Sequence, residues 1–297
     1  MGVQPATSLR DALHIAATRL SGLATARRDA QLLLLRVLGL DRAWLFAHPA
    51  ETLSEEQARQ FDEWIERRAL QEPVQYIVGE QEFHGLTLHI TPDVLIPRPE
   101  TEHLVEAVLK RVSPGNVARI ADVGTGSGAI ALALAQALPR AEVTGLDSSA
   151  SALEVARGNA EQCGLKGRVR WLKSDLLAAV RGEKFDAVVS NPPYVADAEI
   201  LEAQVRLYEP REALYAGPTG LEVYERLIPE AQQALHPIRA DDGAMGTPGM
   251  VAGGWLLLEM GQGQREALAG LLADWDEVEF VADLQGIPRV AIARRRA

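Results

Sequence analysis

A regular alternation of strand and helix patterns beginning at residue 118 constrains the fold of this chain most strongly. The apolar segment 118–123 is followed by the turn Gly124-Thr125-Gly126-Ser127-Gly128, and then by a helix pattern from Ala129 to Leu138 that is almost wholly apolar. Glycines in such a strand–turn–helix unit let the backbone approach a ligand closely, and the helix start directs N–H groups toward it. The unit therefore predicts a ligand-binding α/β domain.

The alternation continues almost to the end of the chain. Further strands are predicted at residues 141–146, 169–172, 185–190, 255–258, 278–281 and 290–293, with helices near 220–235 and 264–272. Strands that alternate with helices indicate a parallel sheet with right-handed crossovers. The glycine-rich stretch 238–254 has few apolar anchors, and we expect it to be a mobile surface loop.

Residues 1–75 have a different, purely helical pattern. Ser8 is a predicted N-cap, residues 27–38 are rich in leucine, and Ser54 opens a third helix with a capping box. Nine arginines and no lysine lie between residues 10 and 68, and eleven acids through Glu80 offset them, which is not the charge balance of a DNA-binding domain. We expect a small helical bundle for partner recognition or substrate positioning.

Residues 76–95 are predicted to form a β-hairpin linker between the helical domain and an α/β domain at residues 96–297. The apolar run Tyr76-Ile77-Val78 is followed by an alternating pattern from Leu86 to Ile90, and either Gly79 or Gly85 marks the turn or a bulge.

Composition excludes several classes of protein. The net charge of −11 argues against a protein that mainly holds nucleic acid, and the apolar runs are too short to span a membrane. The single cysteine, Cys163, excludes an internal disulfide, and the six histidines show no metal-ligand spacing. We expect a cytoplasmic protein without a metal or stable nucleic-acid binding.

Asp147 stands at the end of the second predicted strand, where a carboxylate can accept hydrogen bonds from ribose hydroxyls. Together with the glycine turn it indicates a cofactor that contains a nucleoside, and a nicotinamide dinucleotide fits this pair of features as well as other cofactors do. The turn also fits the dinucleotide fingerprint, whose third position may be the alanine found at Ala129.

The stretch Ser190-Asn191-Pro192-Pro193-Tyr194 follows the fourth predicted strand. Two consecutive prolines have no N–H group and a fixed φ, so the backbone is stiff and presents carbonyl groups without donors. An asparagine side-chain oxygen beside such a carbonyl makes a rigid pair of acceptors, which suits binding an NH2 group by its two hydrogens.

The glycine turn, Asp147, Asp175 after the third strand and this Asn-Pro-Pro-Tyr stretch together resemble class I S-adenosylmethionine-dependent methyltransferases that modify planar NH2 groups. The resemblance implies a Rossmann-like domain whose mostly parallel sheet has an antiparallel last strand. It places Gly124–Gly128 near the methionine part of the cofactor, Asp147 on the ribose, and Asp175 with Leu176 by the adenine. Asn191–Tyr194 would hold the acceptor nitrogen, with Asn191 also near the cofactor.

Three further segments make the resemblance more specific. These are Gln75-Tyr76-Ile77 with Gly79, Ile96-Pro97-Arg98-Pro99-Glu100-Thr101-Glu102, and Glu209-Pro210-Arg211-Glu212-Ala213-Leu214. With the closing Leu256-Leu257-Leu258-Glu259 they resemble the release factor glutamine methyltransferases, the PrmC/HemK family. The resemblance implies a monomer that methylates the glutamine of the Gly-Gly-Gln loop in peptide-chain release factors and releases S-adenosylhomocysteine.

The residues themselves leave three other functions open. An amino-methyltransferase that acts on adenine in DNA or RNA would use the same Asn191–Tyr194 stretch. A nicotinamide-dependent oxidoreductase would leave that stretch without a role. A non-enzymatic adaptor would leave the glycine turn, Asp147 and Asn191–Tyr194 all unused. Arg98, Glu100 and Glu102 either contact the substrate or brace the domain junction, and we favour the junction.

Overall fold

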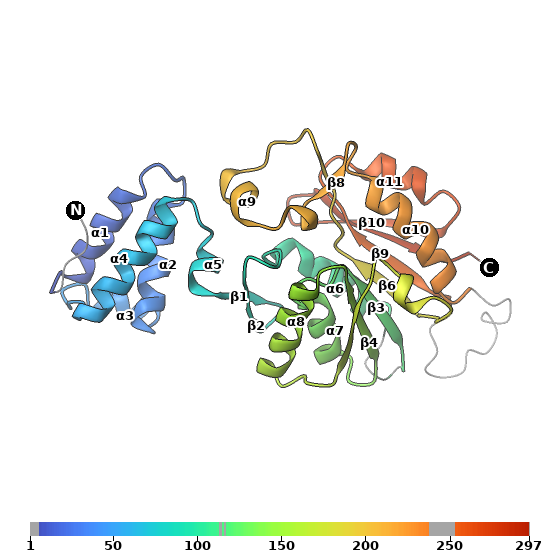
Figure 1. Cartoon of the computed structure of the whole chain (residues 1–297), viewed down its shortest axis with the longest axis horizontal. Coiled ribbons are helices and arrows are strands. Elements are labelled where there is room, and N and C mark those ends of the chain that lie inside the picture. The colour runs from blue at the N-terminus through green and yellow to red at the C-terminus, as the bar shows by residue number, and fades with distance from the viewer. Residues whose placement is uncertain (1–5, 113–114, 116, 238–252, 297) are drawn as a thin grey trace. The chain divides into compact units, whose positions relative to one another are not determined.

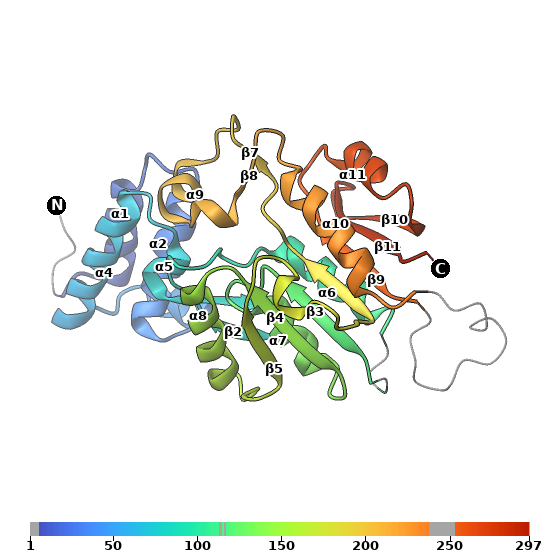
Figure 2. The same cartoon turned by 45° about the vertical axis from the view of Figure 1, so that its right-hand side comes forward.

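The computed structural model describes residues 6–112, 115, 117–237 and 253–296. The chain divides into two compact units. The first comprises the chain up to Gly79 together with Leu201–Tyr208, and the second comprises Glu80–Ile200 and the chain from Glu209 onward. Figures 1 and 2 show the helical character of the first unit and the central sheet of the second.

The first unit is made of helices: α1 (Leu9–Arg19), α2 (Ala26–Leu38), α3 (Arg42–Ala47), α4 (Glu55–Ala69), α5 (Val74–Val78) and α9 (Ala203–Tyr208). Ser8 and Ser54 cap α1 and α4 through their side chains, and Gln57 completes the capping box, as the sequence predicts. The leucine-rich face of α2 buries Leu33 and Leu34 in the centre of this unit.

Helix α9 belongs to the helical unit although it lies far along the sequence. Arg68 is buried, and its Nε donates to Asp29 Oδ2 at 2.8 Å while its Nη2 donates to Gln204 Oε1 at 3.1 Å. The hydroxyl of Tyr208 donates to the Leu70 carbonyl at 2.8 Å. A buried ion pair that also bonds to Gln204 ties this segment to the bundle, and no local pattern in the sequence indicates this contact.

The predicted β-hairpin is shorter than residues 76–95. The hairpin consists of β1 (Glu80–Phe83) and β2 (Leu86–His89), and the turn between them contains Gly85, with φ of 77°. Tyr76-Ile77-Val78 lies in helix α5, which ends at Gly79 in the left-handed conformation. A short apolar run is compatible with a strand or a helix, and here Pro73 before it and Gly79 after it define one helical turn.

The second unit is built on a seven-stranded sheet whose strand order is β10-β11-β9-β6-β3-β4-β5. Its strands are β3 (Arg119–Val123), β4 (Glu142–Asp147), β5 (Val169–Lys173), β6 (Ala187–Ser190), β9 (Trp255–Glu259), β10 (Asp276–Ala282) and β11 (Pro288–Arg294). The last strand, β11, lies between β9 and β10 and is antiparallel to both. The remaining neighbours pair in parallel, so the predicted α/β architecture is confirmed.

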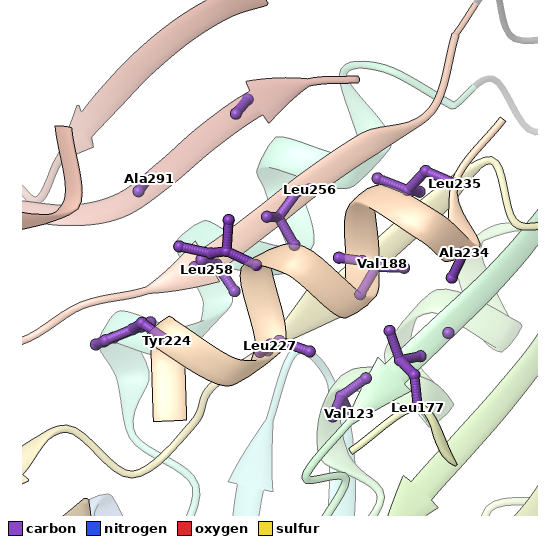
Figure 3. Packing of buried hydrophobic residues seen from close by; sticks show 14 of the residues in the cluster. Val123, Leu177, Val188, Tyr224, Leu227, Ala234, Leu235, Leu256, Leu258 and Ala291 are labelled. Carbon is purple, nitrogen blue, oxygen red and sulfur yellow. The ribbon is translucent and has the colours of Figure 1, made fainter. Parts of the chain in front are cut away.

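Helices cover both faces of this sheet. Figures 1 and 2 show one group on one face and the other on the opposite face. They are α6 (Glu102–Leu109), α7 (Ala129–Ala137) and α8 (Ala150–Gln162), and then α10 (Glu222–Ala234) and α11 (Arg265–Leu271). In Figure 3, Tyr224 and Leu227 of α10 lie near Leu258 and Val188 of the sheet, within one buried apolar cluster. This packing anchors α10 on one face of the sheet.

A second two-stranded element follows the Asn-Pro-Pro-Tyr stretch. Strand β7 (Val195–Ala196) pairs in parallel with β8 (Tyr215–Gly217), and the 3₁₀ turn η3 (Arg211–Ala213) precedes β8. Most of the glycine-rich stretch 238–254, for which we expected a mobile loop, lies outside the described residues. None of the described helices is both long and apolar enough to cross a membrane.

Candidate functional site

Strand register brings the sequence motifs to one edge of the sheet. Val123 at the end of β3 pairs with Leu146 of β4 on one side and with Ser190 of β6 on the other. Each motif begins where its strand ends, so the glycine turn, Asp147 and Asn191 follow these paired residues at the same edge. The carboxyl ends of parallel strands are where open α/β sheets bind ligands.

A cavity of about 270 Å³ opens at this edge. Seven of the twelve predicted site residues line it: Gly124, Gly126, Asp147, Asp175, Leu176, Asn191 and Pro193. The five others, Thr125, Ser127, Gly128, Pro192 and Tyr194, lie outside its lining. The lining also includes Asp93, Val94 and Leu95, which the sequence analysis did not select, and Glu212 of the segment 209–214.

The glycine turn has the backbone shape that only glycine adopts without strain. Gly124, Gly126 and Gly128 have φ of 72°, 53° and 83°. Gly128 also has no room for a side chain, because a Cβ there would lie 3.0 Å from the Trp171 ring and 3.1 Å from Ala156 Cβ. The turn therefore presents bare backbone to the cavity at Gly124 and Gly126.

Asp122 is a buried acid directly beneath this turn that sequence reasoning did not select. Its Oδ2 accepts from Thr125 Oγ1 at 2.6 Å and from the Ala131 N–H at 3.1 Å, while its buried Oδ1 has no partner among the described residues. Burial raises the pKa of Asp122 to about 7, although the two hydrogen bonds lower it in part. An acid as the penultimate residue of a strand before a glycine turn is the signal that could have identified it.

Asp147 holds the glycine turn against the next helix. Its Oδ2 accepts from the Gly126 N–H at 2.8 Å, and its Oδ1 accepts from the Ser149 N–H at 2.9 Å. Ser149 caps α8 by accepting from the Ala152 N–H. Each carboxylate oxygen has a second lone pair, so Asp147 can still accept a bond from a ligand hydroxyl in the cavity.

The third strand contributes Asp175 and Leu176. The carboxylate of Asp175 pairs with Arg226 at 2.6 Å, a contact in which both side chains are more than half exposed. Leu176 has φ of 47°, a left-handed conformation that is uncommon for a residue with a branched side chain. Backbone strain of this kind is concentrated at functional sites, and here it places Leu176 in the cavity lining.

Asn191 and Pro192 present two carbonyl-type oxygens at the start of the Asn-Pro-Pro-Tyr stretch. The side-chain Nδ2 of Asn191 donates to Thr101 Oγ1 at 3.3 Å. No group in the described part of the chain donates to Asn191 Oδ1 or to the Pro192 carbonyl. The hydroxyl of Ser190 donates to the Val123 carbonyl at 2.6 Å and anchors the start of the stretch.

Tyr194 packs against the body of the α/β unit. Its Cδ2 lies 3.0 Å from the position that a Cβ on Gly261 would occupy, and its carbonyl accepts from Gln264 Nε2 at 2.9 Å. Burial raises the pKa of the Tyr194 hydroxyl to about 12. Its phenol is therefore a neutral group near neutral pH.

The charged residues Arg98 and Glu102 of the segment 96–102 form hydrogen bonds with other residues of the α/β unit. Arg98 Nη2 donates to Glu209 Oε1 at 2.5 Å, and the buried Glu209 also accepts from the Ile96 N–H at 3.2 Å. Glu102 accepts from the His84 N–H at 2.9 Å. Arg98 and Glu102 thus brace structure within the α/β unit.

Two buried residues near Asn191 were missed as site residues. Thr101 and Glu259 are each 3% exposed. Glu259 ends β9, and because Ser190 pairs with Leu258, the next residues along, Asn191 and Glu259, are neighbours at the strand ends. An acid that closes an apolar strand was a signal available in the sequence, but only the pairing of β6 with β9 connects it to Asn191.

The helical unit has its own groove, of about 1120 Å³. Four exposed arginines line it, Arg10, Arg27, Arg28 and Arg42, beside an apolar surface that includes Leu32 and Phe46. No acid lines the groove, and none of these four arginines forms an ion pair with a residue that the structure describes. Phe46 is 65% exposed and lies under the Arg42 guanidinium at 5.5 Å.

The described residues include no cluster of His, Cys, Asp and Glu side chains arranged to hold a metal ion. Cys163 is the C-cap residue that follows α8 and is half-buried, with its Sγ 3.8 Å from the Thr87 carbonyl. Burial raises the pKa of this thiol, so it is less reactive than an exposed one.

Comparison with known proteins gives matches along most of the chain. Residues 11–79 match the PrmC N-terminal domain, and residues 99–213 match the methyltransferase small domain. A release factor glutamine methyltransferase of Moorella thermoacetica is 44% identical over 296 residues, covering 97% of this chain and 99% of that protein. Its counterpart from Koribacter versatilis is 42% identical over 273 residues, covering 91% of each.

Solved structures share the fold at lower identity. The catalytic domain of hMettl16 superposes with a TM-score of 0.55 at 17% identity, covering 79% of this chain and 82% of that one. A methyltransferase from Pyrococcus furiosus superposes with a TM-score of 0.50 at 19% identity, covering 72% of this chain and 90% of that one. The class I methyltransferase fold expected from the motifs is confirmed.

Proposed function

The chain belongs to the family of release factor glutamine methyltransferases, and we propose that it transfers a methyl group from S-adenosylmethionine to a release factor glutamine. The acceptor is the side-chain amide nitrogen of the glutamine in the Gly-Gly-Gln loop. The observation that carries the proposal is the pair of donor-free oxygens, Asn191 Oδ1 and the Pro192 carbonyl, at the end of the strand beside the cavity. An amide NH2 offers the two hydrogens that such a pair accepts.

The residues at the strand ends fit the methyl donor. S-adenosylmethionine carries a positive sulfonium, a positive amino group and ribose hydroxyls, and it supplies an electrophilic methyl group. Gly124 and Gly126 leave space beside its methionine part, and Asp147 is available to ribose hydroxyls. Asp175 and Leu176 would lie by the adenine.

Asn191 and Pro192 act on the acceptor nitrogen. The lone pair of an amide nitrogen is delocalised into its carbonyl, which makes the nitrogen a poor nucleophile. When Asn191 Oδ1 and the Pro192 carbonyl each accept one N–H, they hold the nitrogen in place and favour its pyramidal form. They also stabilise the positive charge that grows on the nitrogen, as preorganised dipoles do in enzyme sites.

No side chain needs to remove a proton before transfer, because an alkylated amide cation is a strong acid and loses its proton readily. Tyr194, with the pKa of its hydroxyl raised to about 12, is a neutral packing group. Its ring would form the flat wall of the acceptor pocket. Pro193 lines the cavity and, with Pro192, keeps the backbone stiff.

The helical domain, residues 1–75, would recognise the release factor. Its groove combines four arginines without acid partners and exposed apolar side chains, so it suits an amphipathic, acidic segment of a protein. Residues 96–297 would carry the chemistry, and the linker at residues 76–95 would join the two domains. Complementary charge increases the rate at which such partners meet and selects among them.

Charge reversal tests this docking role. Arg28→Glu should raise the KM for intact release factor about threefold and leave kcat nearly unchanged. Arg59→Glu is the matched control, because Arg59 is an exposed arginine of the same unit that does not line the groove. Equal effects of the two changes on KM would show that only overall charge matters.

An amino-methyltransferase that acts on adenine in DNA or RNA is the alternative function, because it would use the same Asn-Pro-Pro-Tyr stretch. The test offers labelled S-adenosylmethionine with intact release factor, with its loop glutamine changed to alanine, and with total DNA and RNA. Label on the intact release factor alone supports methylation of the release factor glutamine. Label on nucleic acid would assign the enzyme to the adenine class.

We also propose that the protein works as a monomer in the cytoplasm, where release factors act on ribosomes. The family resemblance supports the monomer, and the protein substrate supports the location. Sedimentation that gives a dimer mass at assay concentrations would contradict the monomer.

A further inference from the structure

Glu259 is a buried acid for which the proposed function has so far given no role. It ends β9 beside Asn191 and is 3% exposed. Its Oε2 is buried and has no partner among the described residues. Its carboxylate hydrogen-bonds the Thr101 hydroxyl, and Thr101 Oγ1 in turn accepts from Asn191 Nδ2 at 3.3 Å. Three residues far apart in sequence thus form one chain of hydrogen bonds.

The chemistry of these groups fixes the direction of that chain. An ionised carboxylate only accepts hydrogen bonds, so the single hydroxyl proton of Thr101 must point to Glu259. The Thr101 oxygen then receives a hydrogen from Asn191, and an asparagine amide can supply one only through Nδ2. Because Nδ2 points toward Thr101, the oxygen of the same amide, Asn191 Oδ1, points away from Thr101.

We propose that Thr101 and Glu259 are positioning residues that orient the Asn191 amide so that its oxygen, rather than its NH2 group, faces the acceptor nitrogen. The inference rests on the proposed function, in which Asn191 Oδ1 accepts an N–H of the substrate amide. If the Asn191 side-chain amide rotated so that Oδ1 and Nδ2 exchanged places, its NH2 group would face the substrate NH2 group. Two groups that only donate cannot hydrogen-bond to each other. The orientation of one amide therefore decides whether the pocket accepts a glutamine.

The ionisation of Glu259 controls this orientation. Burial raises its pKa to about 7, the Thr101 bond lowers it, and Arg289, Glu100 and Arg98 act on it through charge. Two tyrosines also lie close by: Glu259 and Tyr194 interact by charge, and the Tyr224 hydroxyl donates to the Glu259 backbone carbonyl. A protonated Glu259 can donate to Thr101, which releases the Thr101 proton and lets the Asn191 amide reverse.

The direction of the pH effect follows. The productive orientation requires ionised Glu259, so the methyl-transfer rate should fall as pH falls through the pKa of Glu259. With a midpoint near 7, the single-turnover rate at saturating cofactor should drop about tenfold between pH 8 and pH 6.

Variants of the two residues test the proposal. Thr101→Val keeps the shape but removes the hydroxyl, and it should lower the single-turnover rate about tenfold while leaving S-adenosylhomocysteine affinity unchanged. Thr101→Ser restores the hydroxyl and should restore both the rate and the pH profile. Glu259→Gln cannot titrate, so its lower rate should no longer fall at acid pH. Glu100→Gln, the matched change of a nearby acid, should keep the acid limb and move its midpoint downward.

A second readout needs no substrate and separates this inference from the proposed function. The side-chain NH2 resonances of Asn191, assigned by their absence in Asn191→Ala, should titrate with a midpoint near 7 and stop titrating in Glu259→Gln. Titration in a protein that does not methylate release factor would support the orientation and refute the proposed function. Asn191 NH2 resonances that do not shift with pH would overturn the proposal. A Thr101→Val enzyme with the wild-type single-turnover rate and pH profile would overturn it as well.

Discussion

The two halves of the site are built in different ways. The half assigned to the cofactor comes mostly from one strand–turn–helix–strand stretch, β3 through Asp147, within which the Gly126 N–H donates to Asp147. The half assigned to the acceptor joins three distant segments. Pairing of β6 with β9 brings Asn191 beside Glu259, and Thr101 reaches Asn191 from the 3₁₀ turn η1 (Pro99–Thr101). The first half depends on one stretch of the chain and the pairing of β3 with β4, and the second depends on contacts between segments that are far apart in the sequence.

The largest effect is expected in the acceptor half. Asn191→Ala removes the oxygen that accepts the substrate N–H, so turnover should fall about 10²- to 10³-fold, the scale for loss of one preorganised polar contact. Affinity for S-adenosylhomocysteine should stay nearly unchanged. Single-turnover kinetics and calorimetry measure the two quantities, and a near-normal rate would remove Asn191 from this role.

The next effect belongs to the cofactor half. Asp147→Ala removes a charged acceptor from the cavity and also leaves the Gly126 N–H without its partner. Cofactor affinity should weaken about 10- to 100-fold, as expected for hydrogen bonds to a charged group. Calorimetric titration with S-adenosylhomocysteine checks this, and unchanged affinity would contradict the assignment of Asp147.

A smaller effect tests the scaffold beneath the cofactor half. A Cβ on Gly145 of β4 would lie 2.5 Å from the Trp171 ring, so the ring must move if Gly145→Ala is to fold. We expect a loss of about 1–3 kcal/mol in the free energy of unfolding, the usual cost of overpacking. Denaturant unfolding measures it. Stability equal to that of the wild type would mean that the ring moves at no cost.

The smallest effect is expected at the cap of α8. Ser149→Ala removes the side-chain bond to the Ala152 N–H and should cost about 1 kcal/mol of stability. The backbone N–H of Ser149 still donates to Asp147, so cofactor affinity should stay within about twofold of the wild type. A large loss of affinity would show that Asp147 depends on the cap as well as on the backbone.

The same difference explains how far the sequence could predict the structure. The glycine turn, its flanking strand and helix, and the alternation of elements have local patterns, and the structure confirms them. Tyr76–Val78 was placed in a strand because three apolar residues do not distinguish a strand from one helical turn. The link from Thr101 to Glu259 and the place of α9 in the helical unit depend on tertiary contacts between distant segments, which no local pattern contains.

One measurement tests the division of the site most directly. Single-turnover methyl transfer to release factor would be followed for Asp147→Ala and Asn191→Ala while the S-adenosylmethionine concentration is raised to saturation. If the halves act as assigned, the Asp147 variant recovers most of its rate at saturating cofactor, and the Asn191 variant remains slow. Recovery of the Asn191 variant, with the Asp147 variant still slow, would contradict the assignment of both halves.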